Sequence, residues 1–157
     1  MEGMNNTTKK PLNHNRMEKE FVPYELALKM KQLGYKKEGV DEDCFAFYDE
    51  EEYLFTVREQ DDIDEEWLIA PTFSQAFRWF REKYGYLHHI TYFDPVKAQI
   101  PGEADYQGLV LFPHQDVHKL AKISYDTYEE AELACLKKLI EIVEQTHAEM
   151  TDHGVYK

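Results

Sequence analysis

Carboxylates are the chemical groups that this sequence concentrates most. Between residues 41 and 66, thirteen Asp and Glu residues accompany a single basic residue, Arg58. The whole chain has 18 basic and 31 acidic residues, a formal net charge of −13. Carboxylates at this density can bind a metal ion, share protons in catalysis or face a basic partner. The same charge argues against nucleic acid or an anionic membrane as a direct partner, since each requires a cationic surface.

A calcium site is one reading of this charge. Asp62, Asp64 and Glu66 alternate as the oxygen ligands of a calcium-binding loop do. The glycine that such a loop needs at its sixth position is missing, however, and the spacing fails beyond the third ligand. No two carboxylates stand out with different surroundings, as an acid–base pair requires. We therefore expect a solvated run of charge here rather than a metal or catalytic site.

Histidines offer a second metal reading. His114 and His118 have the i, i+4 spacing that places two imidazoles on one helical face, as a zinc site needs. Gln115 stands where a zinc protease would carry its glutamate base, so hydrolysis is not supported. His88 and His89 lie on a predicted strand and point to opposite faces, so at most one could join. Third and fourth ligands are not evident, and we expect no metal and no cofactor.

Nucleophilic chemistry has no signature in the chain. Ser74 and Ser124 lack any elbow or base motif, and no glycine-rich phosphate loop is present. Cys44 and Cys135 are set among apolar residues without CxxC spacing, which is typical of buried, reduced thiols. We therefore expect a protein without enzymatic activity.

The remaining interpretation of the acidic stretch is a binding surface. Aromatic anchors flanked by carboxylates suit a basic patch on a protein partner, because charge speeds the encounter and the aromatic rings supply affinity. The residues assigned to partner binding are Tyr48, Asp49, Glu50, Glu51, Glu52, Tyr53, Trp67 and Trp79.

Other readings of this surface stay open. Carboxylates on a strand commonly prevent another chain from pairing with a sheet edge, which needs no partner. The chain could instead be an acidic DNA mimic that inhibits a host nucleic-acid-binding or defence protein, or a virion-associated structural protein. A homo-oligomer also stays open, because an exposed hairpin edge or Trp79 could be buried in a symmetric dimer.

Seven elements are predicted to position these residues. Pro23 and Gly34 suit the two ends of a first helix, and Thr72 with Gln75 matches a capping box at the start of a second. The predicted order is helix 23–33, strands 44–48 and 53–57, helix 73–84, strands 86–93 and 107–112, and helix 128–145. Residues 94–106 are expected to form a loop, and 113–125 either a short helix or a strand. The α-β-β-α-β-β-α order predicts an α+β fold, an antiparallel sheet with helices packed mainly on one face.

The ends of the chain are predicted to lie outside a single domain. Residues 1–18 have few large apolar side chains and are expected to form a flexible arm, with Met17 an alternative start. The domain is expected over 19–146, followed by a polar tail at 147–157. There is no secretory signal and no apolar run of about 18 residues, which favours the cytoplasm.

Four segments carry a resemblance to a known group of proteins. They are FVPYELALKMKQLGY, CFAFYDEEEYLFT, APTFSQAFRWFREKYG and DTYEEAELACLKKLIEIV. They resemble small uncharacterised proteins of Bacteroides-type gut bacteria and their phages and mobile elements. The resemblance implies a phage or mobile-element setting, in the cytoplasm of the host cell or in the virion. Because that family has no established activity, it implies no mechanism and no functional residue.

Overall fold

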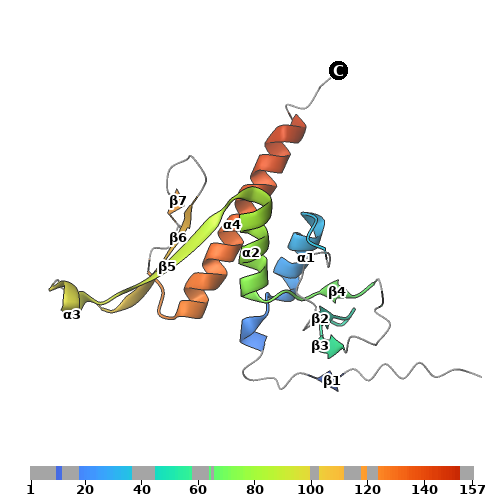
Figure 1. The fold of residues 1–157 in the computed structure, drawn as a ribbon, viewed down its shortest axis with the longest axis horizontal. Helices are drawn as coiled ribbons and strands as arrows, with labels where there is room; N and C mark the ends of the chain where they lie inside the picture. The colour runs from blue at the N-terminus through green and yellow to red at the C-terminus, as the bar shows by residue number, and fades with distance from the viewer. Residues whose placement is uncertain are drawn as a thin grey trace, which may run out of the picture. The chain divides into compact units, whose positions relative to one another are not determined.

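The computed structural model describes residues 10–11, 18–36, 45–57, 64, 66–99, 103–111, 118–119 and 124–152. These residues fall into two compact units, Met1–Gln75 and Ala76–Lys157, where the sequence predicted one domain. Each unit contains an antiparallel sheet and helical structure, so the predicted α+β class is confirmed (Figure 1).

The sheet of the first unit has the strand order β1-β3-β2-β4. Its centre is the predicted hairpin, β2 (Phe45–Tyr48) and β3 (Leu54–Val57), whose register places Phe47 opposite Phe55. The two-residue strand β4 (Leu68–Ile69) pairs with the outer side of β2 and was not predicted. Within the predicted flexible arm, the two-residue strand β1 (Lys10–Pro11) pairs with β3.

The hairpin turns through residues 49–52. The Glu52 N–H donates to the Asp49 carbonyl (3.0 Å), and Glu52 follows with a φ of 62°. This is the arrangement of a three-residue hairpin loop, whose left-handed position usually holds glycine. The Asp49 carboxylate compensates, because its Oδ1 accepts from the N–H groups of Glu51 (3.0 Å) and Tyr53 (2.9 Å). The turn is therefore fixed by Asp49 rather than by glycine.

The helix of the first unit covers one face of this sheet. Helix α1 (Tyr24–Gln32) follows the short 3₁₀ turn η1 (Glu18–Glu20), starts after Pro23 and ends before Gly34, whose φ is 94°. Its buried residues Leu26, Ala27 and Met30 were predicted from their spacing. The helix packs against β4, and the Tyr48 hydroxyl donates to the Val22 carbonyl at 2.8 Å.

The opposite face of the sheet carries an aromatic cluster. Side chains alternate between the two faces of a strand, so Phe47 and Phe55 point away from the face that Tyr48 uses. Both are almost completely buried, at 1% and 0% exposure. Around them pack four partly buried side chains, Tyr53, Val57, Trp67 and Ile69. The sheet thus buries both faces, one under α1 and one in this cluster.

Helix α2 (Phe73–Tyr84) begins at the end of the first unit and continues in the second. Its predicted capping box is confirmed: Gln75 N–H donates to Thr72 Oγ1 (3.2 Å), and Thr72 N–H donates to Gln75 Oε1 (2.9 Å). Its predicted apolar stripe is buried at Phe73, Ala76, Phe77 and Phe80.

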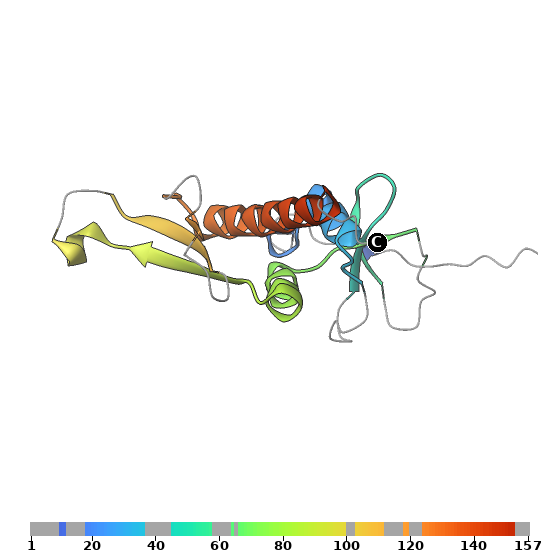
Figure 2. The ribbon, with the colours of Figure 1, turned by 90° about the horizontal axis from the view of Figure 1, so that it is seen from above.

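The sheet of the second unit has the order β5-β6-β7. Strands β5 (Leu87–Phe93) and β6 (Asp105–Leu111) form a long hairpin that extends beyond the start of α4 (Figure 2). The connection between them contains a short helix, α3 (Pro95–Ala98), where the sequence predicted only a loop. Asp94 caps this helix by accepting from the Val96 and Lys97 N–H groups. The ambiguous segment contains a third strand, β7 (His118–Lys119).

Helix α4 (Tyr128–Asp152) packs against β5 and β6. Its predicted apolar face is fully buried and consists of Ala131, Cys135, Leu136, Leu139, Ile140 and Val143. The helix was predicted to end at Gln145, with a polar tail from 147, but it continues to Asp152. No Gly or Pro interrupts residues 146–152, so nothing local ends the helix once its buried face has ended. Across the described ranges, no helix is both long and apolar enough to cross a membrane.

Candidate functional site

The hairpin loop of the first unit forms one side of an acidic hollow of about 380 Å³. Because Tyr48 pairs with Leu68 in the antiparallel register, the chain at Trp67 returns to the end of the hairpin where Asp49 begins the loop. The pairing of β4 with β2 therefore assembles the site. Its lining residues are Asp49, Glu50, Glu51, Asp64, Glu66 and Trp67.

Backbone hydrogen bonds hold the two acidic segments in place. Asp49 Oδ1 organises the hairpin loop, and Asp64 Oδ1 accepts from the Glu66 N–H at 3.0 Å. The Trp67 N–H donates to the Asp64 carbonyl at 3.2 Å, which fixes the start of β4 to the same turn. Each aspartate thus has a structural role, whereas Glu50, Glu51 and Glu66 are exposed to solvent.

Trp67 is the aromatic wall of the acidic hollow. Its ring meets Phe55 edge to face at a centroid distance of 4.9 Å and lies 5.8 Å from the Phe47 ring. The ring is half-buried. One part of it therefore packs in the aromatic cluster, and the other part is available to whatever enters the hollow.

The lining of the acidic hollow suits an organic cation, because it places carboxylates beside an aromatic ring. In the part of the chain that the structure describes, no three His, Cys, Asp or Glu side chains are grouped to hold a metal. Asp64 and Glu66, which the sequence placed in a calcium pattern, instead share an aspartate turn, and Asp62 lies outside the described residues. A guanidinium group matches this lining, since it stacks on aromatic rings and bonds to several carboxylates at once.

Half of the predicted partner-binding residues do not line the acidic hollow. Tyr48 is buried with its hydroxyl bonded to Val22, so its assignment as an anchor is wrong. Tyr53 packs on the Phe47 and Phe55 cluster. Glu52 is exposed but does not line the hollow.

Trp79 belongs to the second unit and has its own neighbours there. Its ring lies 4.8 Å from Phe80 and 5.5 Å from Tyr84, and the Lys83 ammonium stands 4.9 Å from its centroid. It is half-buried and does not line the acidic hollow. Trp67 is therefore the tryptophan of the candidate site.

The structure describes only one of the two histidines in the predicted zinc pair. His118 lies in strand β7 opposite Val110, so the prediction of a helix at His118 is wrong. His114 lies outside the described residues. His89 is exposed, and His88 faces the other way, stacked on Phe77 at 3.5 Å between ring centroids. The prediction that His88 and His89 face opposite sides is confirmed.

Acid is expected to destabilise the fold through His88. Burial, with smaller contributions from Arg81 and His89, lowers the pKa of His88 to about 4 from its ordinary 6.5. Between these two pH values the unfolded chain binds a proton at this histidine and the folded chain does not. The free energy of unfolding therefore falls as the pH drops from about 6.5 towards 4. We expect H88F to lose less stability than the wild type between pH 7 and pH 4.5 in urea unfolding, by on the order of 1 kcal/mol because solvent screens the half-exposed ring.

The matched control for this pH effect is H89F, which changes the exposed neighbour on the opposite face. H89F should lose almost as much stability in acid as the wild type does, since His89 makes only a small contribution to the lowered pKa of His88. If H89F reduces the loss of stability in acid as much as H88F does, the stacked position of His88 is not the cause of the pH effect.

The cysteine prediction is confirmed at one of its two residues. Cys135 is free and fully buried, its sulfur lies 3.9 Å from the Leu109 carbonyl, and burial raises its pKa to about 11. A thiol in this setting keeps its proton at neutral pH and is not a nucleophile. Cys44 lies outside the described residues.

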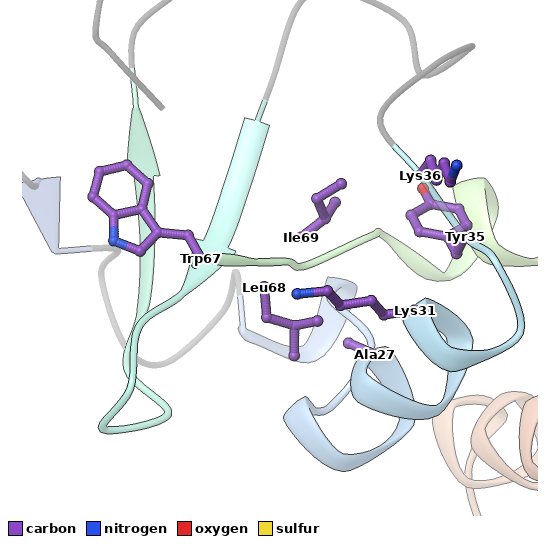
Figure 3. Close-up of a pocket in the computed structure, with 7 residues that line it drawn as sticks. All are labelled: Ala27, Lys31, Tyr35, Lys36, Trp67, Leu68 and Ile69. Carbon is purple, nitrogen blue, oxygen red and sulfur yellow. The ribbon is translucent and has the colours of Figure 1, made fainter. Parts of the chain in front are cut away.

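A second hollow, of about 340 Å³, was not predicted (Figure 3). It lies between α1 with its following residues and β4, and its lining residues are Ala27, Lys31, Tyr35, Lys36, Trp67, Leu68 and Ile69. The sequence gives no reason to single out Lys31 and Lys36, because single lysines beside a helix end form no pattern of their own. Only the pairing of β4 with β2 places apolar residues opposite them.

Comparison of the chain with protein-family models, with curated proteins and with solved structures gave no match. The resemblance to proteins of gut bacteria and their phages therefore stays a prediction from the sequence, and the function of the chain is argued from its own residues.

Proposed function

We propose that this protein is a non-catalytic binding module that receives a basic side chain of a protein partner in the acidic hollow. The observation that carries the proposal is the grouping of five carboxylates from two segments around one half-buried tryptophan ring. The resemblance adds a setting, an accessory protein of a phage or mobile element acting in the host cytoplasm.

Arginine fits this lining better than lysine. Its guanidinium is flat and weakly hydrated, so it can stack on Trp67 while its N–H groups donate to Glu50, Glu51 or Glu66. A cation on an aromatic face contributes about 0.5–1 kcal/mol at exposed sites, and an exposed ion pair about 0.2–1 kcal/mol. One arginine alone therefore binds weakly, and a physiological partner would present several basic residues.

The loop geometry supports binding as well as charge does. Glu50 and Glu51 lie at the tip of a turn that Asp49 holds with two hydrogen bonds. A loop ordered in advance loses less conformational entropy when a partner binds. Carboxylates that only protect a sheet edge would need neither an ordered loop nor the Trp67 ring beside them.

The test is the binding of short peptides by calorimetry at low salt. N-acetylated, amidated peptides containing three arginines, three lysines or three citrullines separate guanidinium recognition from charge and from shape. We expect affinity to decrease in that order, and we expect the double variant E50K/E51K to weaken arginine-peptide binding about tenfold, because it removes two ion pairs and adds two repulsions.

The matched control is Glu52, which carries the same charge in the same loop but does not line the hollow. E52K should weaken binding by less than twofold. If E52K acts as strongly as E50K or E51K taken singly, net charge rather than the hollow determines binding. Equal affinity for the arginine and citrulline peptides would also contradict the proposal.

A further inference from the structure

The second hollow differs in chemistry from the acidic hollow beside it. Its wall is mostly apolar: Ala27, Tyr35 and Leu68 are buried at 2%, 5% and 5% exposure, and Ile69 is partly buried. Clefts of about 300–1,000 Å³ with an apolar lining and a few polar groups are typical of small-molecule sites. Its volume of about 340 Å³ is at the lower end of that range, enough for one ring system.

The charge of the second hollow is opposite to that of the chain. Its lining contains two lysines and no carboxylate, in a protein with a net charge of −13. Both lysines are exposed, and Figure 3 shows the Lys31 side chain reaching from α1 towards Leu68, with its ammonium group directed at β4. Lys36 and Tyr35 lie at the other end of the group from Trp67. A negatively charged group that enters the second hollow therefore lies close to the Lys31 ammonium group and to the apolar side chain of Leu68.

Trp67 is shared by both hollows. Apart from Trp67, the acidic hollow is lined only by carboxylates, which repel an anion. The second hollow is lined by Lys31 and Lys36, which attract one. Because the linings of the two hollows have opposite charge, the hollows do not compete for the same ligand.

We propose that the second hollow binds a small amphipathic anion, a carboxylate that carries an aromatic or branched apolar body. The carboxylate pairs with the Lys31 ammonium, and the apolar body lies against Leu68 and the open edge of β4, where Ile69 and Trp67 complete the lining. Tyr35 is neutral in this wall, since burial raises its pKa to about 12. This site is separate from the proposed function, which uses the other side of Trp67.

The test uses three naphthalene probes of the same shape: naphthalene-2-acetate, its neutral amide and the cationic 2-(2-naphthyl)ethylamine. Binding is followed on the full chain by shifts of the Leu68 and Ile69 methyl signals in NMR titrations. We expect the acetate to bind at least about threefold more tightly than the amide, as one exposed ion pair allows, and the amine to bind most weakly.

Charge reversal identifies the lysines that bind the probe. K31E should lower acetate affinity about tenfold and K36E about threefold, while the affinity for the neutral amide stays within twofold. Lys29 lies on the same helix outside the lining, so K29E makes the same change in net charge and should leave acetate binding unchanged. Equal binding of acetate and amide, equal effects of K29E and K31E, or shifts confined to methyl groups outside the lining would each overturn the proposal.

Discussion

Replacing Phe55 with alanine is expected to lower the free energy of unfolding by about 3–5 kcal/mol, the usual cost of truncating a buried phenylalanine. Phe55 has no solvent exposure, lies 6.2 Å from the Phe47 ring and meets Trp67 at 4.9 Å. Its removal leaves a cavity that the surrounding rings fill only in part. Urea unfolding measures the loss, and tryptophan emission of F55A should shift to longer wavelength as Trp67 gains contact with water.

Val57 supplies the comparison for this variant. It lies on the same strand and packs on the same cluster, but it is only partly buried, so V57A should cost about 1 kcal/mol. A loss in F55A no larger than that in V57A would mean that the cluster does not hold the sheet together. The candidate site would then lack the rigid support that the binding proposal assumes.

Local signals in the sequence predicted most of the fold. The hairpin around residues 49–52 was found because two β-prone runs flank a polar connector, and α2 because a capping box precedes a regular apolar stripe. Both signals lie within a few residues of the element that they specify. Tertiary context did not need to override them.

The errors fall where structure depends on distant residues or on very short elements. Strand β4 has two residues and exists through its pairing with β2, so no periodicity could reveal it. Helix α3 did have a local signal, an aspartate cap followed by Pro95, but four residues are too few for an apolar pattern. Helix α4 continues past its buried face because nothing in the chain stops it.

In the candidate site, too, local signals were predicted correctly and contacts between distant residues were not. The sequence grouped Asp49, Glu50 and Glu51 with Trp67 by chemistry alone, and the register of β4 on β2 brings them together. It could not tell that Tyr48 points to the helix side of the sheet, because that depends on which face each helix covers. It also could not place Lys31 opposite β4, since a contact between α1 and β4 joins residues far apart in the chain.

Trp67 offers the sharpest single test of both proposals, because both hollows use it. We expect W67A to weaken the binding of the arginine peptide about two- to fivefold, the range that a lost cation–π contact of about 0.5–1 kcal/mol allows. Naphthalene-2-acetate should also bind more weakly, because the hollow loses one of its walls. Calorimetry on W67A gives the first value, and the Ile69 methyl titration gives the second.

The variant W67F separates recognition from stability. Phenylalanine retains an aromatic face and packing against Phe55 and Phe47, so W67F should keep most of the stability while losing part of the affinity for arginine. Trp79 provides a matched control, since W79F removes the other tryptophan without touching either hollow. If W67A stays folded and binds both ligands as the wild type does, neither hollow uses the ring that joins them. If only the arginine peptide is affected, the second hollow does not use the Trp67 ring, which contradicts the placement of the anion's apolar body there.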